Sequence, residues 1–135
     1  QVQGWILAAS TEQLERSEVV SRTIVSRNLR HTSAVLEFQS SYPPMAQTSK
    51  NNDLLALYSQ VSEDLGYGKI TAVNPRNAGA ADISFAAEHV DMSLDGLGLM
   101  GSGAHTNNEI ADLTTLNKNI EKTAILIYRL SKHKK

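Results

Sequence analysis

Apolar and polar residues follow different patterns in successive segments of the chain. Residues 2–9 form a short apolar run, and residues 34–38 alternate apolar with polar side chains. The first pattern is typical of a buried or half-buried strand and the second of a strand with one wet face. Apolar positions from Leu14 to Leu29 recur among charged residues as in an amphipathic helix. We therefore predict strand, helix and strand over residues 1–46.

The first helix carries a capping signature. Ser10 is followed three residues later by Gln13. We expect the Ser10 side chain to accept a hydrogen bond from the backbone and the Gln13 side chain to reach back. His31 lies where a cation suits a helix C-terminus, so we expect it to close the helix and to be structural.

The second part of the chain alternates helices with short strands. A polar stretch, residues 46–52, precedes the clearest helix, in which Leu54 and Tyr58 recur at helical spacing and Gly66 follows the end. Residues 69–73 then predict a short strand.

The pattern continues through a small-residue turn to a closing helix. We expect Asp82 to cap a short helix in the first place and to be a site residue in the second. Another strand is predicted within residues 90–99 and a final helix within 113–130. Four apolar residues of that helix are expected to face inward: Leu116, Ile120, Ala124 and Ile127. This order predicts an α/β half-domain, with the whole chain α+β.

Composition limits the function classes. The 135 residues are 41% hydrophobic, enough for a core, and carry 13 Lys and Arg against 14 Asp and Glu. This balance excludes an electrostatic footprint for nucleic acid or an anionic membrane, and the basic residues 132–135 are interpreted as a solvated tail. Without cysteine, any metal must be held by histidine and carboxylates.

No apolar run reaches the ~20 residues of a membrane span, and no signal peptide opens the chain. We expect a soluble protein; the sequence does not distinguish a cytoplasmic from a periplasmic or secreted location. The chain opens on Gln1 and enters an apolar run at once, which we interpret as a piece of a longer polypeptide.

A glycine-rich run at residues 96–109, GLGLMGSGAHTNNE, delivers His105 into a polar turn. Its glycines permit close backbone approach. The spacing Gly96-x-Gly98-x-x-Gly101 also fits the dinucleotide fingerprint, but neither a helix at the glycines nor a following strand is predicted, so a nucleotide site is disfavoured. Spacing alone leaves open whether His105 is a ligand or an ordinary loop residue.

Two motifs taken together resemble the co-catalytic zinc carboxypeptidase and deacylase family. Residues 76–82, RNAGAAD, are similar to the family's Arg-Thr-Gly-Gly-Gly-Thr-Asp turn, and residues 101–109, GSGAHTNNE, to its Gly-x-Gly-x-His-[Ser/Thr]-x-x-Glu turn. The family includes glutamate carboxypeptidase, acetylornithine deacetylase, succinyl-diaminopimelate desuccinylase and aminoacylase. The order of the two motifs and the closing helix match as well.

The resemblance implies a role for each matching residue. His105 is expected to be one ligand of a two-zinc centre. Thr106, Glu109 and Asp82 are expected to support the ligand without binding metal themselves. A contact with the substrate carboxylate or backbone is implied for three further residues: Arg76, Asn77 and Gly79.

The resemblance also implies an organisation. Residues 1–46 are similar to the C-terminal part of the family's ferredoxin-like lid or dimerisation domain, and residues 47–135 to the C-terminal part of its catalytic domain. The remaining zinc ligands and the general base come from the preceding half in that family. We therefore expect no catalytic residue in this chain, weak or absent zinc binding, no activity of the chain alone, and a homodimer through the lid.

The implied function is hydrolysis of an amide bond in a small peptide or N-acyl amino acid. Four departures bear on it: Leu7 and Tyr42 stand where the family has arginines, and Ala78 and Ala80 replace glycines. Because the arginines would anchor an acidic substrate, the substrate stays open. The alternative is a non-catalytic relative that acts as an oligomerisation or peptide-binding module.

Overall fold

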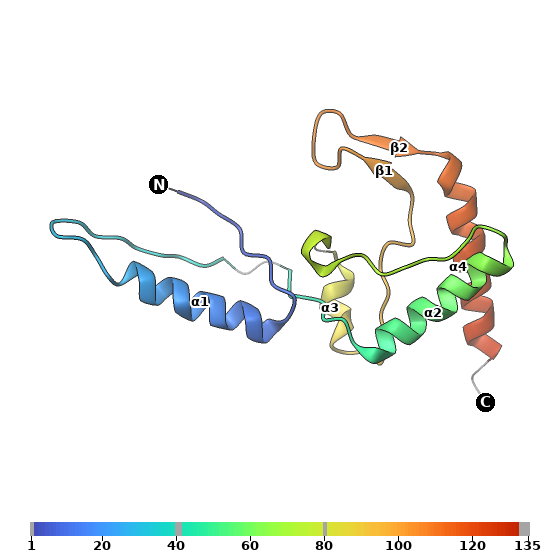
Figure 1. Cartoon of the computed structure of the whole chain (residues 1–135), viewed down its shortest axis with the longest axis horizontal. Coiled ribbons are helices and arrows are strands. Elements are labelled where there is room, and N and C mark those ends of the chain that lie inside the picture. The colour runs from blue at the N-terminus through green and yellow to red at the C-terminus, as the bar shows by residue number, and fades with distance from the viewer. Residues whose placement is uncertain (1, 40–41, 80, 133–135) are drawn as a thin grey trace. The chain divides into compact units, whose positions relative to one another are not determined.

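The computed structural model describes residues 2–39, 42–79 and 81–132. The chain divides into two units, Gln1–Gln47 with Val73–Asp91 (unit 1) and Thr48–Ala72 with Met92–Lys135 (unit 2). In the described residues the fold is mostly helical, with four α-helices and one antiparallel hairpin (Figure 1). None of these helices is long and apolar enough to cross a bilayer. The domain division predicted from the sequence stays a prediction.

Helix α1 (Thr11–Val25) begins where the capping signature predicts. The Gln13 backbone N–H donates to Ser10 Oγ at 3.2 Å, and the Gln13 side-chain oxygen accepts from the Ala9 backbone N–H at 2.8 Å. Both members of the capping box are therefore formed, with Gln13 reaching one residue beyond Ser10.

Helix α1 ends earlier than predicted, at Val25, so the expectation that His31 closes it was wrong. The Thr23 hydroxyl donates to the Val19 carbonyl and the Ser26 hydroxyl to the Thr23 carbonyl, each at 2.8 Å. Such side chains compete for the backbone near a helix end. The helix also contains no buried residue, so tertiary packing does not extend it.

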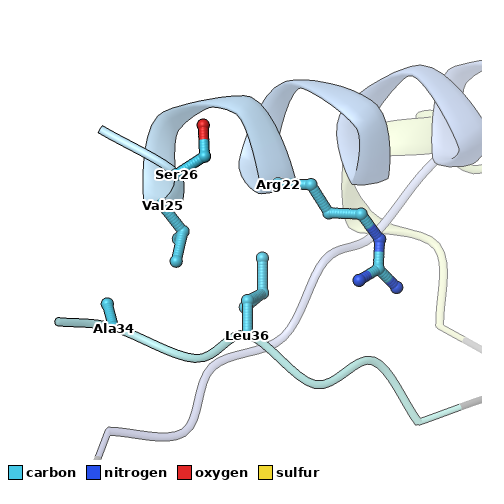
Figure 2. A pocket seen from close by; sticks show the side chains of 5 residues that line it. All are labelled: Arg22, Val25, Ser26, Ala34 and Leu36. Atoms are coloured by element: carbon cyan, nitrogen blue, oxygen red, sulfur yellow. The ribbon is translucent and has the colours of Figure 1, made fainter. Parts of the chain in front are cut away.

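An extended segment, residues 33–39, runs back along α1 (Figure 1). Val25 and Leu36 point toward one another across the gap (Figure 2). The Arg22 guanidinium lies over the Phe38 ring, 5.0 Å from its centroid. Contacts of this kind hold the segment against the helix without burying either.

The four strands predicted from apolar patterns, at residues 2–9, 34–38, 69–73 and 90–99, are absent from the described structure. These segments have no strand secondary structure because no neighbouring strand supplies the ladder of backbone hydrogen bonds. The expected α/β sheet is therefore wrong for the described residues, while the broad α+β class holds. Unit 1 is completed by a 3₁₀ turn, η1 (Pro75–Asn77), and the short helix α3 (Ile83–Ala87).

Unit 2 is organised around helices α2 (Ser49–Asp64) and α4 (Thr114–Lys132). Both helices were predicted. The Thr48 hydroxyl caps α2 by accepting from the Asn51 N–H at 3.0 Å. The helix ends as predicted before Gly66. This residue has a φ of 76°, a conformation that glycine adopts at little cost in free energy.

The apolar core of unit 2 lies between these helices. Its buried members are Leu54, Tyr58 and Val61 of α2 and Leu126 of α4. Partly buried side chains pack around them: Leu65, Ile70, Leu94, Leu97, Ile125 and Leu130. Leu54 and Tyr58 are residues whose helical spacing predicted α2.

Two polar contacts tie α4 to α2 and to the turn after it. Arg129 pairs with Asp64 at 2.5 Å, and the Tyr67 hydroxyl donates to Glu121 at 2.5 Å. Hydrogen bonds from Gln60 and then Arg129 hold the pKa of Asp64 below its usual value. Both contacts are exposed, so the buried core carries most of the packing energy.

The inward face of α4 differs from the prediction. Leu126 is 5% exposed, whereas Leu116, Ile120 and Ile127 are 41%, 57% and 62% exposed, and Ala124 is exposed too. The predicted stripe carries more apolar residues, but α2 packs on the face that contains Leu126, which also bears the buried Asn119. Periodicity identifies an amphipathic helix but cannot say which of its faces meets a partner.

We predict that Leu126→Ala lowers the free energy of unfolding by roughly 2–5 kcal/mol, because it leaves a cavity in the core. The neighbouring Ile127→Ala, which removes an exposed side chain of similar size, should change it by less than about 0.5 kcal/mol. Urea unfolding followed by circular dichroism measures both. Equal losses, or a larger loss for Ile127→Ala, would contradict the observed orientation of α4.

Candidate functional site

The glycine-rich run folds into a β-hairpin that carries His105 in its turn. Strand β1 (Met100–Ser102) pairs antiparallel with β2 (Ile110–Asp112), with Gly101 opposite Ala111. Every residue from 100 to 112 is exposed. The hairpin therefore presents its turn to solvent.

Two glycines are required by the closeness of the hairpin strands. A Cβ on Gly101 would lie 2.3 Å from the Ile110 carbonyl oxygen, and one on Gly103 would lie 2.7 Å from the Asn108 oxygen. Gly103 also has a φ of 68°. Because a strand and a turn follow Gly98, and no helix opens at the glycines, the dinucleotide interpretation lacks its structural context.

Thr106 makes several of the hydrogen bonds that hold the turn. Its N–H and its hydroxyl both donate to the Gly103 carbonyl, at 3.1 and 2.7 Å. The hydroxyl also accepts from the Asn108 N–H at 3.1 Å, and the Thr106 carbonyl accepts from the Glu109 N–H at 3.2 Å. The structure thus brings His105, Thr106 and Glu109 together in one turn.

His105 occupies an uncommon backbone conformation, with φ of 63°. Its side chain is exposed, and the bonds of Thr106 fix the backbone on its C-terminal side. An exposed imidazole on a fixed backbone is available to an approaching metal ion or substrate. The role of His105 as a ligand stays a prediction.

Three residues that anchor the hairpin to α4 were missed by the sequence analysis. The buried Asn119 side-chain amide donates to the Gly98 carbonyl, and Thr115 Oγ1 accepts from the Met100 N–H at 3.1 Å. Asp112 accepts from the Thr114 N–H at 3.0 Å and from its hydroxyl at 2.7 Å. The available signal was the helical spacing that places Thr115 and Asn119 on the face of Leu126.

The Asp112 carboxylate is stabilised in its charged form. Hydrogen bonds from the Thr114 hydroxyl and backbone N–H, with a smaller contribution from the charge of Lys118, lower the pKa of Asp112. The carboxylate stands at the start of α4, where negative charge also suits the helix dipole.

The residues expected to contact substrate lie in unit 1, whereas His105, Thr106 and Glu109 lie in unit 2. Arg76 and Asn77 belong to η1, where the Asn77 N–H donates to the Asn74 carbonyl at 2.8 Å. A Cβ on Gly79 would meet nothing within 4 Å, so there is open space beside this backbone. Their predicted role in substrate binding stays a prediction.

Asp82 does not cap α3, so that prediction was wrong. Its φ of −57° and ψ of −26° are helical, and its side chain makes no capping bond. Instead, a hydrogen bond from the Tyr42 hydroxyl to the Asp82 carboxylate raises the pKa of Tyr42. The Tyr42 ring also contacts Phe85, with centroids 5.2 Å apart.

Among the predicted site residues, His105 is the one whose side chain suits a zinc ion. A neutral imidazole is a common zinc ligand. In the part of the chain that the structure describes, no three His, Asp or Glu side chains gather in a way that could hold a metal ion. Of the predicted site residues, only His105 was expected to bind zinc directly, and that role is not tested by this arrangement.

The hollow in Figure 2 does not coincide with any predicted site residue. It has a volume of about 220 Å³ and is lined by Arg22, Val25, Ser26, Ala34 and Leu36. The Arg22 guanidinium is already paired with Glu18 at 2.6 Å. A hollow whose only charged group is paired offers little to a ligand, so we assign it no function.

Comparison of the chain with models of known families, with curated proteins and with solved structures finds no match.

We predict that Gly101→Ala disrupts the pairing of β1 with β2, because the new Cβ would overlap the Ile110 carbonyl oxygen. Gly98→Ala is the matched control, since a Cβ there meets nothing within 4 Å. Cross-strand nuclear Overhauser effects between Gly101 and Ala111 should disappear in the first variant and persist in the second. Their persistence in both would contradict the close approach.

The link between Asp112 and α4 should weaken in acid. Because its pKa is lowered in the folded state, its stabilisation is present above the unfolded-state pKa and is lost as pH falls through the folded value. We expect the Thr114 amide resonance to shift below about pH 4. Asp112→Asn, which keeps an accepting oxygen but cannot titrate, should remove that shift.

Proposed function

We propose that this chain is the C-terminal part of a zinc-dependent metallopeptidase or amidohydrolase, with His105 as one zinc ligand. Its substrate would be a small peptide or an N-acyl amino acid. The observation that carries the proposal is the exposed imidazole in the turn of a glycine-dependent hairpin, within the sequence GSGAHTNNE.

The geometry of the turn suits a metal ligand in two ways. The His105 side chain is exposed, so a ring nitrogen can reach an ion without displacing core residues. The backbone bonds made by Thr106 limit the movement of the turn, and a fixed backbone reduces the entropy lost when the ligand binds. Thr106 and Glu109 would support His105 in this way without contacting the ion.

A zinc pair, when bound, would activate water and polarise the scissile carbonyl. This chain would contribute one ligand, His105, and the substrate contacts of Arg76, Asn77 and Gly79. The other ligands and the general base would come from polypeptide outside this sequence. The 135 residues alone are therefore expected to be inactive.

The proposal does not extend to an acidic amino-acid substrate. Leu7, at one expected arginine position, is exposed and carries no charge. Tyr42, at the other, shares a hydrogen bond with Asp82. Neither side chain can supply the bidentate cation that binds a carboxylate.

Unit 1 supports a second candidate function, an oligomerisation or peptide-binding module. Trp5, Leu7 and Val35 are 82%, 77% and 87% exposed on extended segments that belong to no sheet in the described structure. Extended backbone with open hydrogen-bonding groups can accept a strand from another chain. A homodimer through this unit is compatible with either candidate.

The test uses the chain joined to the polypeptide encoded before it, with zinc measured by mass spectrometry and hydrolysis measured on N-acyl amino acids and dipeptides. His105→Ala should remove one zinc and lower kcat/KM by more than about 100-fold, since it deletes a ligand. His31→Ala is the matched control, because His31 is exposed and has the same φ of 63°.

Unchanged zinc content and activity in His105→Ala would contradict the proposal. A wild-type protein that takes up no zinc and hydrolyses nothing, but forms dimers in sedimentation, would favour the second candidate.

A further inference from the structure

We propose that Asn119 and Thr115 of α4 are the positioning residues of the His105 hairpin. The consequence for the metal ligand rests on the proposed function; the consequence for the hairpin does not.

The hairpin cannot be ordered by apolar packing of its own. Its two strands have three residues each, and all six are exposed. An isolated two-stranded hairpin is marginally stable in water. Its order must therefore depend on contacts made at its base.

Those contacts come from one helix. Asn119 donates to the Gly98 carbonyl just before β1, and Thr115 accepts from the Met100 N–H at 3.1 Å, at the first residue of β1. On the other strand, Asp112 is the last residue of β2 and accepts from Thr114 at the start of α4. Both ends of the hairpin are thus attached to α4.

Asn119 connects these attachments to the core. It is 6% exposed and lies two helical turns before Leu126, on the same face of α4. Packing of α4 on α2 therefore fixes the amide that holds Gly98. Through this bond, the position of the hairpin follows the position of the core.

Amide hydrogen exchange of the 135-residue chain tests the attachment. Asn119→Asp removes the donor at nearly constant size, and Asn117→Asp makes the same change at an exposed position of the same helix. We expect exchange in Met100–Ser102 and Ile110–Asp112 to become at least ~10-fold faster in Asn119→Asp, as expected for a hairpin that is marginal without its base contacts. Exchange in the control, and in Val61 and Leu126 of both variants, should be unchanged.

A second pair of variants tests the attachment if Asn119→Asp does not fold. Thr115→Val removes the accepting hydroxyl and should also speed exchange of the hairpin, whereas Thr115→Ser keeps the hydroxyl and should restore the slow rate. Unchanged exchange in Asn119→Asp and Thr115→Val would overturn the proposal. So would equal effects of Thr115→Val and Thr115→Ser.

The zinc affinity of the chain joined to its preceding polypeptide tests the positioning. Thr115→Val should weaken zinc binding by roughly 10- to 100-fold, the usual effect of a residue that orients a ligand, and Thr115→Ser should not. Faster amide exchange in the hairpin of Thr115→Val, together with an unchanged zinc affinity, would overturn the positioning role. If wild type binds no zinc but the exchange results hold, the hydrolase proposal fails and the attachment of the hairpin to α4 is supported.

Discussion

The described structure depends on the packing of α2 against α4. Among the residues that the structure describes, the four buried apolar ones lie at this contact, and none belongs to α1. Because burial of apolar surface is the main stabilising term in folding, the small α2–α4 core carries a large share of the stability available to the chain.

The start of α1 and the end of α2 could be predicted from the sequence because their causes are local. Ser10 and Gln13 form their capping bonds within one turn, and Gly66 ends α2 by its own conformational freedom. Strands could not be predicted in the same way, because residues 34–38 need a neighbouring strand to become one. The prediction of the inward face of α4 was wrong for a related reason, because packing against α2 determines which face is buried.

In the candidate site, too, local features could be predicted and a contact between distant residues could not. The turn that holds His105 could be predicted because its glycines and Thr106 act within a few residues of one another. The attachment of that turn to Asn119 could not, because it joins residues 21 apart in the sequence. Asp82 shows the opposite error: a residue type common at helix starts is used instead for a contact with Tyr42.

The left-handed backbone at His105 has a cost of its own. A residue with a Cβ loses about 1–2 kcal/mol in that conformation relative to glycine. His31 adopts the same φ of 63°, and there too the following threonine, Thr32, donates from its N–H and its hydroxyl to the carbonyl three residues back, that of Leu29. At position 105 a glycine would therefore make the turn more stable than the histidine does. The proposed zinc ligand therefore occupies a backbone conformation that lowers the stability of its own turn.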